Sequence, residues 1–193
     1  MDLKRAERAG TIGAVGGGLL VTGALVPFDW VFALAALATG MLAYVAWTLG
    51  CRLDPGRDPR RQAGGLIAAA GLGLAATGFI VALLAALTMR PDIVMAMLAS
   101  VVSTGLYVVL PIGLLLLGTR ILQWDELSTL GRWLPLLMGL LGVLTIPATV
   151  LISLPWFEPG AFATFLGLVR EIPLAAWIPL GVVLRRAGKI DDL

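Results

Sequence analysis

AGGLIAAAGLGLAATGFIVALLAALTM occupies residues Ala63–Met89 and contains no charged side chain. An α-helix rises about 1.5 Å per residue, so about 20 apolar residues cross the roughly 30 Å hydrocarbon core of a bilayer. The tract exceeds this length and therefore predicts a transmembrane helix.

Similar tracts recur along the 193-residue chain, in which 59% of residues are apolar and only 13% are charged. The uncharged tracts are Ala9–Phe28, Trp30–Cys51, Ala63–Met89, Ile93–Thr119, Trp133–Phe157 and Ile172–Leu184. The last tract reaches spanning length when Gly160–Val169 is added, which places Arg170 and Glu171 within the span. The sequence predicts an all-α membrane protein, with residues 1–193 forming one domain of six transmembrane helices. These helices form three hairpins, at 9–50, 63–118 and 133–184.

The first two hairpins resemble each other in sequence. Residues 10–26, GTIGAVGGGLLVTGALV, match residues 65–81, GLIAAAGLGLAATGFIV, at nine of 17 positions without a gap. A shared apolar composition raises such matches by itself, so a genuine repeat and chance similarity both stay open. Repeated hairpins would have the same orientation, which makes any such repeat parallel rather than inverted.

The basic residues predict the orientation of the chain. Twelve of the 14 fall on one side of the predicted bundle: Lys4, Arg5, Arg8, Arg52, Arg57, Arg60, Arg61, Arg120, Arg132, Arg185, Arg186 and Lys189. Basic loops remain in the cytoplasm, so we expect both termini to be cytoplasmic in a bacterial or archaeal cytoplasmic membrane. We read these charges as topology signals that face the lipid bilayer, with no nucleic-acid partner. The first tract is interpreted as a retained helix rather than a cleaved signal peptide.

The glycine-rich segment Gly13–Gly18 suggests a phosphate-binding loop at first sight. Such a loop follows a buried strand, whereas the preceding residues, MDLKRAERA, are charged and helical in character. Small residues let membrane helices approach closely, so we expect helix packing instead. The candidate packing glycines are Gly13, Gly17, Gly18, Gly71 and Gly73. A role in lining a permeation path is the alternative.

Arg170 and Glu171 are the strongest candidates for a functional site in the sequence, because both are charged and lie within the sixth predicted span. Ionisable residues at membrane depth are costly and mark functional sites by default. The densest cluster of hydroxyl-bearing residues that could contact them is Ser100, Ser103 and Thr104 in the fourth predicted span. The alternative is structural, with Arg170 extending outward and Glu171 held by hydroxyls or protonated.

The chain has no histidine and one cysteine, Cys51. Histidine-based metal sites and the commonest proton-transfer group are therefore excluded. No nucleophile and base pattern is present either, so we expect no enzyme activity and no cofactor. Two functional classes stay open. The first is a non-catalytic membrane subunit or scaffold that packs against a membrane protein partner or a second copy. The second is a small-solute or ion transporter or channel using Arg170 and Glu171.

The last third of the chain resembles a family of uncharacterised bacterial six-helix membrane proteins, a domain of unknown function. The similar residues are LGRWLPLLMGLLGVL at 130–144 and LVREIPLAAWIPLGVVLRRAG at 168–188. Members have a W-L entry to the fifth helix, and a Glu followed by an apolar W-L segment in the sixth. The resemblance implies six helices and no known activity.

Overall fold

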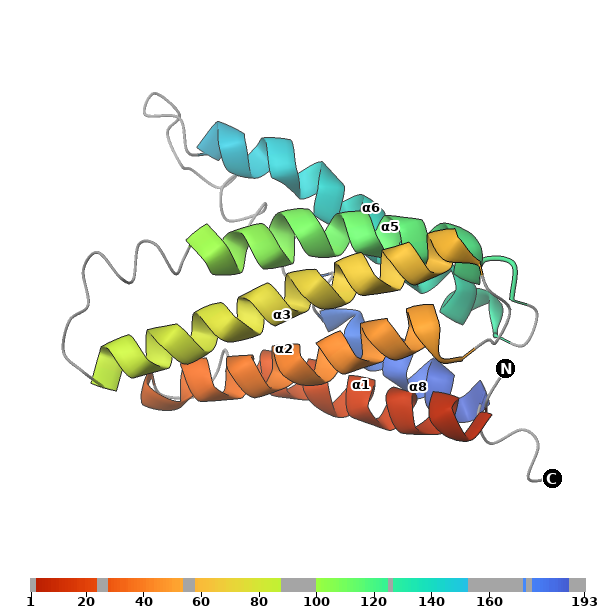
Figure 1. Ribbon diagram of the computed structural model, residues 1–193, viewed down its shortest axis with the longest axis horizontal. Helices are drawn as coiled ribbons and strands as arrows, with labels where there is room; N and C mark the ends of the chain where they lie inside the picture. The colour runs from red at the N-terminus through yellow and green to blue at the C-terminus, as the bar shows by residue number, and fades with distance from the viewer. Residues whose placement is uncertain are drawn as a thin grey trace.

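The computed structural model describes residues 3–23, 28–53, 58–87, 100–124, 127–152, 172 and 175–187, and its regular elements over these residues are all helices (Figure 1). They are α1 (Leu3–Gly23), α2 (Phe28–Cys51), α3 (Pro59–Leu87), η1 (Gly105–Val109), α5 (Leu110–Ile121), α6 (Thr129–Ile152) and α8 (Trp177–Ala187). The predicted all-α class is correct for the described residues.

Helices that follow one another in the chain also pack against one another. Contacts join α1 to α2, α2 to α3, α3 to α5, and α5 to α6, while α8 returns to pack along α1. The helices run up and down, so that α1 begins and α8 ends at the same end of the bundle (Figure 1). The first and last helices therefore meet although they are far apart in the sequence.

One apolar core joins these helices. Its most deeply buried large side chains include Leu42 of α2, Leu72 of α3, Leu114 of α5, Met138 of α6 and Trp177 of α8, each at most 1% exposed. Leucine and alanine dominate the core, as expected for helices that pack closely along most of their length. The core has contributions from both halves of the chain.

Four helices are long and apolar enough to cross a membrane: Trp30–Cys51, Pro59–Leu87, Ser100–Ile121 and Thr129–Ile146. Large apolar side chains cover their outer faces as well as their inner ones, among them Leu37, Leu84 and Leu144, which are more than half exposed. Outward apolar surface of this extent suits a lipid environment rather than water. The chain is thus a helical protein with at least four membrane-capable helices.

The helix from Ser100 to Ile121 contains a π-helical turn, η1, which ends at Val109, two residues before Pro111. The backbone N–H of Leu110 donates to the carbonyl of Gly105, five residues back. Proline cannot continue the regular hydrogen-bond ladder, and a wider turn is one way for a helix to accommodate it. Gly105 packs against the backbone of Gly71 in α3, so close helix contact coincides with the irregular turn.

Several helices extend beyond the uncharged tracts that predicted them. α1 begins at Leu3 and includes charged residues, and α3 begins at Pro59, four residues before the predicted start of the second hairpin. Charged residues can continue a helix where its end emerges from the apolar layer, because their side chains then reach polar surroundings. Hydropathy marks the membrane-embedded part of a helix rather than its ends.

Candidate functional site

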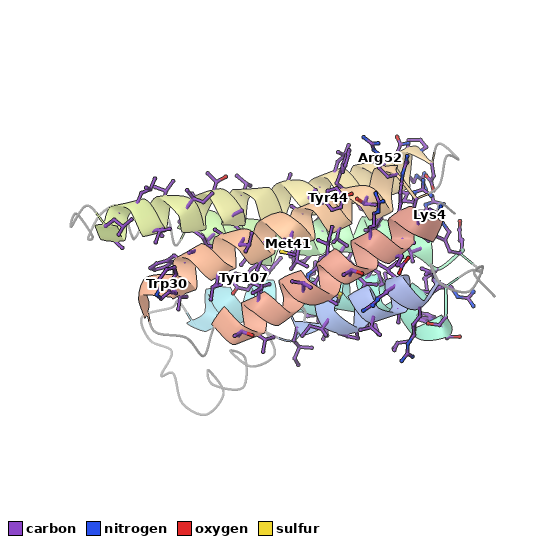
Figure 2. All side chains as sticks on the ribbon, turned by 90° about the horizontal axis from the view of Figure 1, so that it is seen from below. Lys4, Trp30, Met41, Tyr44, Arg52 and Tyr107 are labelled. Atoms are coloured by element: carbon purple, nitrogen blue, oxygen red, sulfur yellow. The ribbon has the colours of Figure 1, made fainter. Side chains whose placement is uncertain are left out.

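The charged side chains gather at one end of the bundle, which we call the loop end: α1, α3 and α6 begin there, and α2, α5 and α8 end there (Figure 1). Figure 2 shows Lys4 and Arg52 at this end and Trp30 at the opposite one. Within the described ranges, the charged residues other than Asp29, which lies in the first turn of α2, belong to the loop end. They are the basic Lys4, Arg5, Arg8, Arg52, Arg60, Arg61, Arg120, Arg132, Arg185 and Arg186, and the acidic Glu7 and Asp58.

Arg61 is the most deeply buried of these charges, with only 1% of its surface exposed. Its Nε atom donates a hydrogen bond of 3.2 Å to the carbonyl oxygen of Gly50, in the last turn of α2. Its guanidinium carbon lies 5.3 Å from the centre of the Trp124 ring, which follows α5. The last carbonyls of a helix lack partners within the helix and carry partial negative charge, so a cation is favourable there. Arg61 thereby joins the end of α2, the start of α3 and the segment after α5.

Local sequence places Arg61 in the first turn of α3. Asp58 precedes Pro59, an order favoured at helix starts, and the Oδ1 atom of Asp58 accepts a 3.0 Å hydrogen bond from the backbone N–H of Arg60. The Oδ2 atom of Asp58 also lies 3.4 Å from the Nε atom of Arg120. This partly exposed ion pair joins the start of α3 to the end of α5.

Two facing glycines bring α2 close enough for the Arg61 contact. A Cβ atom on Gly50 would lie 2.6 Å from the Cα atom of Gly65, so the two backbones touch. No side chain would fit between them without moving the helices apart. Beside this contact, the guanidinium carbon of the exposed Arg52, the residue after α2, lies 4.6 Å from the centre of the Trp47 ring of α2, in a cation–π arrangement.

The predicted Arg170–Glu171 group is described only in part. Arg170 and Glu171 lie outside the described residues, so their surroundings stay a prediction. Ser100, Ser103 and Thr104 are all exposed on their helix, and the Thr104 hydroxyl donates to the Ser100 carbonyl at 2.8 Å.

The candidate packing glycines occupy two kinds of position. A Cβ atom on Gly17 would lie 2.8 Å from Ile178 of α8, and one on Gly71 would lie 2.7 Å from the carbonyl of Gly105. A Cβ on Gly13 would make an ordinary contact with Gly181 at 3.5 Å. At Gly18 and Gly73, no atom of the described chain lies within 4 Å of such a Cβ.

The buried hydroxyl groups of the described interior are used locally. Thr39 and Thr48 of α2 donate to carbonyls four residues earlier, Ala35 at 2.7 Å and Tyr44 at 2.8 Å. Thr145 of α6 donates to the Gly142 carbonyl at 2.6 Å. The indole Nε1 of Trp177 is the buried side-chain polar atom that lacks a hydrogen-bond partner within the described part of the chain. The described interior is therefore apolar, with its hydroxyls directed at helix backbone.

Sequence reasoning missed the role of Arg61, which was treated as a loop charge that sets orientation. Two signals were available. The Asp58–Pro59 pair marks a helix start, and Arg61 shares its helical face with the buried Gly65, Ala68 and Leu72. Its contact with Trp124 carried no signal, because nothing local to either residue indicates that they meet.

Comparison with known proteins adds no homologue: no protein-family model, no curated protein and no solved structure matches this chain. The resemblance of its last third to bacterial six-helix membrane proteins therefore stays a prediction.

Proposed function

We propose that this chain is a six-helix integral membrane protein that serves as a non-catalytic membrane subunit or scaffold, with both termini in the cytoplasm. Four membrane-capable helices and the common position of the start of α1 and the end of α8 support this arrangement. The other two spans would be α1 continued through the tract ending at Phe28, and the helix that ends with α8. The basic loop end would face the cytoplasm.

The observation that carries the scaffold role is the division of small residues between inner and outer faces. Gly17 and Gly71 pack against other helices of the bundle, Gly17 against Ile178 and Gly71 against Gly105. Gly18 and Gly73, in contrast, are open, and each is followed four residues later by an exposed threonine, Thr22 or Thr77. The Thr22 hydroxyl donates a 2.8 Å hydrogen bond to the carbonyl oxygen of Gly18, and the Thr77 hydroxyl donates a 2.9 Å hydrogen bond to that of Gly73. The outer faces of α1 and α3 therefore carry two similar flat surfaces without large side chains, which we call the low-relief strips: Gly18 with Thr22 on α1, and Gly73 with Thr77 on α3.

Low-relief strips of this kind suit a transmembrane helix of another protein. In lipid, helices associate through close van der Waals contact, which a glycine with a small residue four positions away permits. The apolar side chains around the strips, such as Val15 and Leu74, match the same environment. We assign the strips to a partner helix. Because the hydroxyls of Thr22 and Thr77 already donate to carbonyls of their own helices, the strips would present an apolar contact surface to that partner.

Co-purification from the native membrane, followed by mass spectrometry, tests the role. We expect Gly18→Leu or Gly73→Leu to lose a partner that the wild type retains, with melting in detergent unchanged. Gly40→Leu is the matched control, because Gly40 is exposed on α2 and also has no described atom within 4 Å of a Cβ. A partner set unchanged in all three variants would contradict the proposal. If size-exclusion chromatography with light scattering shows that the lost partner is a second copy, a scaffold for other proteins is excluded.

A further inference from the structure

Three side chains stack on one another on α2 and directly after it, next to the loop end. The ring centres of Tyr44 and Trp47 are 6.0 Å apart, and the guanidinium carbon of Arg52 lies 4.6 Å from the centre of the Trp47 ring. Figure 2 shows Met41, Tyr44 and Arg52 in this order toward the loop end. The two distances place the aromatic rings and the cation on one surface, which we call the α2 stack: Tyr44, Trp47 and Arg52.

The polar groups of the α2 stack are free to bind a ligand. Arg52 is exposed and forms no ion pair within the described part of the chain, whereas Arg120 at the same end pairs with Asp58. Tyr44 is 44% exposed, and its hydroxyl forms no hydrogen bond to any described residue. A ring face holds a guanidinium in place but leaves the N–H groups at its edge able to donate. The stack therefore presents a positioned cation and a hydroxyl to the surroundings of the bundle.

The same face of α2 becomes apolar with distance from the loop end. Trp47 follows Tyr44 by three residues and Leu37 precedes it by seven, and both spacings keep side chains on one helical face. Leu37 is 56% exposed and lies about 10 Å from Tyr44 along the helix axis. Tyrosine and tryptophan are enriched at the headgroup level of membranes, and α2 is long and apolar enough to cross one. A ligand that fits this face combines negative charge, polar groups and hydrocarbon in that order.

We propose that the α2 stack binds the phosphate headgroup of an anionic phospholipid. Arg52 donates to the phosphate, the Tyr44 hydroxyl donates to an ester oxygen, and an acyl chain lies along Leu37. Hydrogen bonds from arginine to phosphate are charge-assisted, and basic side chains at a membrane surface attract anionic lipids. A free phosphate ion would meet Arg52 but would leave the apolar face beyond Tyr44 uncovered.

The lipid site and the scaffold role are independent of each other. The low-relief strips lie on α1 and α3, whereas the stack belongs to α2 and the residue that follows it. The lipid site rests on the bundle being embedded in a membrane. A partner helix could therefore be lost without any change in lipid binding.

Melting of the purified full-length protein in a neutral detergent, with and without added lipid, tests the site. We expect phosphatidylglycerol to raise the melting temperature of the wild type by about 2–4 °C relative to phosphatidylcholine, because a ligand that binds only the folded state stabilises it. Inorganic phosphate at the same concentration should give no rise. Native mass spectrometry of the wild type should likewise retain more phosphatidylglycerol than phosphatidylcholine.

Single variants locate the site. Arg52→Gln should lose the rise with phosphatidylglycerol, and Tyr44→Phe, which removes only the hydroxyl, should reduce it. Arg60→Gln is the matched control, because Arg60 is also exposed at the loop end and contacts Asp58 through its backbone N–H rather than its side chain. This control removes the same charge and should respond like the wild type.

Each deviation from this pattern has a definite meaning. Equal loss in Arg52→Gln and Arg60→Gln would show general charge attraction and overturn the assignment to the α2 stack. A full rise in Tyr44→Phe would overturn the role of its hydroxyl. An equal rise with inorganic phosphate would overturn the assignment to lipid. If Arg52→Gln does not fold, the wild-type mass spectra decide, and retention of phosphatidylglycerol no greater than that of phosphatidylcholine contradicts the proposal.

Discussion

Gly17 of α1 lies directly against Ile178 of α8: a Cβ atom on the glycine would come within 2.8 Å of the Cγ1 atom of Ile178 and 3.0 Å of its backbone nitrogen. The next residue, Gly18, has no described atom within 4 Å at the same position. Two adjacent glycines of one helix thus have different surroundings, because successive positions turn by about 100° around the helix axis.

Replacing the two glycines separately should therefore change the thermal stability in one case and leave it nearly unchanged in the other. Gly17→Leu must push α8 away from α1, and overpacking of this kind costs about 1–3 kcal/mol or more. Gly18→Leu adds a side chain on an open face and should melt close to the wild type. Thermal unfolding of both variants in the same detergent measures the difference, and equal melting temperatures would show that the α1–α8 contact does not contribute to stability.

Arg61 should contribute more to stability than any exposed arginine of the loop end. Arg61→Leu removes a charge-assisted hydrogen bond to the last turn of α2 and the contact with Trp124. We expect a loss of about 2–3 kcal/mol. Arg60→Leu, one position earlier and exposed, should stay within about 0.5 kcal/mol of the wild type. Comparable losses in the two variants would mean that charge alone matters at this end, irrespective of burial.

The orientation can be measured at two exposed positions. In a Cys51→Ala background, single cysteines replace Arg60 at the loop end and Trp30 at the opposite end. Because the basic loop end should be cytoplasmic, we expect a membrane-impermeant maleimide added to intact cells to label position 30 and not position 60. Labelling of both sites after permeabilisation is the accessibility control. The reverse pattern in intact cells would invert the proposed topology.

Glu171 distinguishes the scaffold from the transporter that the sequence left open. In a scaffold, Glu171→Leu should melt at or above the wild-type temperature with its partner set unchanged, since apolar replacements of buried charged groups are often neutral or stabilising. Glu171→Gln should then differ little from the wild type. A lowered melting temperature for the leucine variant, together with retained folding of the glutamine variant, would favour a polar site and a transport role.

Much of the architecture could be read from residues 9–50 and 63–118 alone. Continuous apolar tracts longer than about 20 residues require helices in a membrane, because a lipid-exposed backbone must satisfy its own hydrogen bonds. The same local logic explains why the loop end carries the charges. Helix ends were less accessible to this reasoning, as the start of α3 at Pro59 shows, because a helix can continue beyond the apolar layer.

The candidate packing glycines were likewise predictable from the sequence only in part. That glycines such as Gly17 and Gly71 suit close packing follows from their lack of a side chain, but the same property belongs to Gly18 and Gly73. Which of them meets a neighbour depends on how each helix is rotated about its axis. Hydropathy is nearly uniform around α3, so it does not specify the rotation of that helix.

The sequence by itself determined that the chain is helical and membrane-capable and that its charges concentrate between and beside the apolar tracts. Length, apolarity and charge are local properties that act on a helix without reference to its neighbours. Only the tertiary structure decided that α8 returns to α1, that Gly50 faces Gly65, and that Arg61 is buried beside Trp124. These contacts join residues distant in sequence, and they depend on the complementary shapes of two surfaces rather than on the composition of either one.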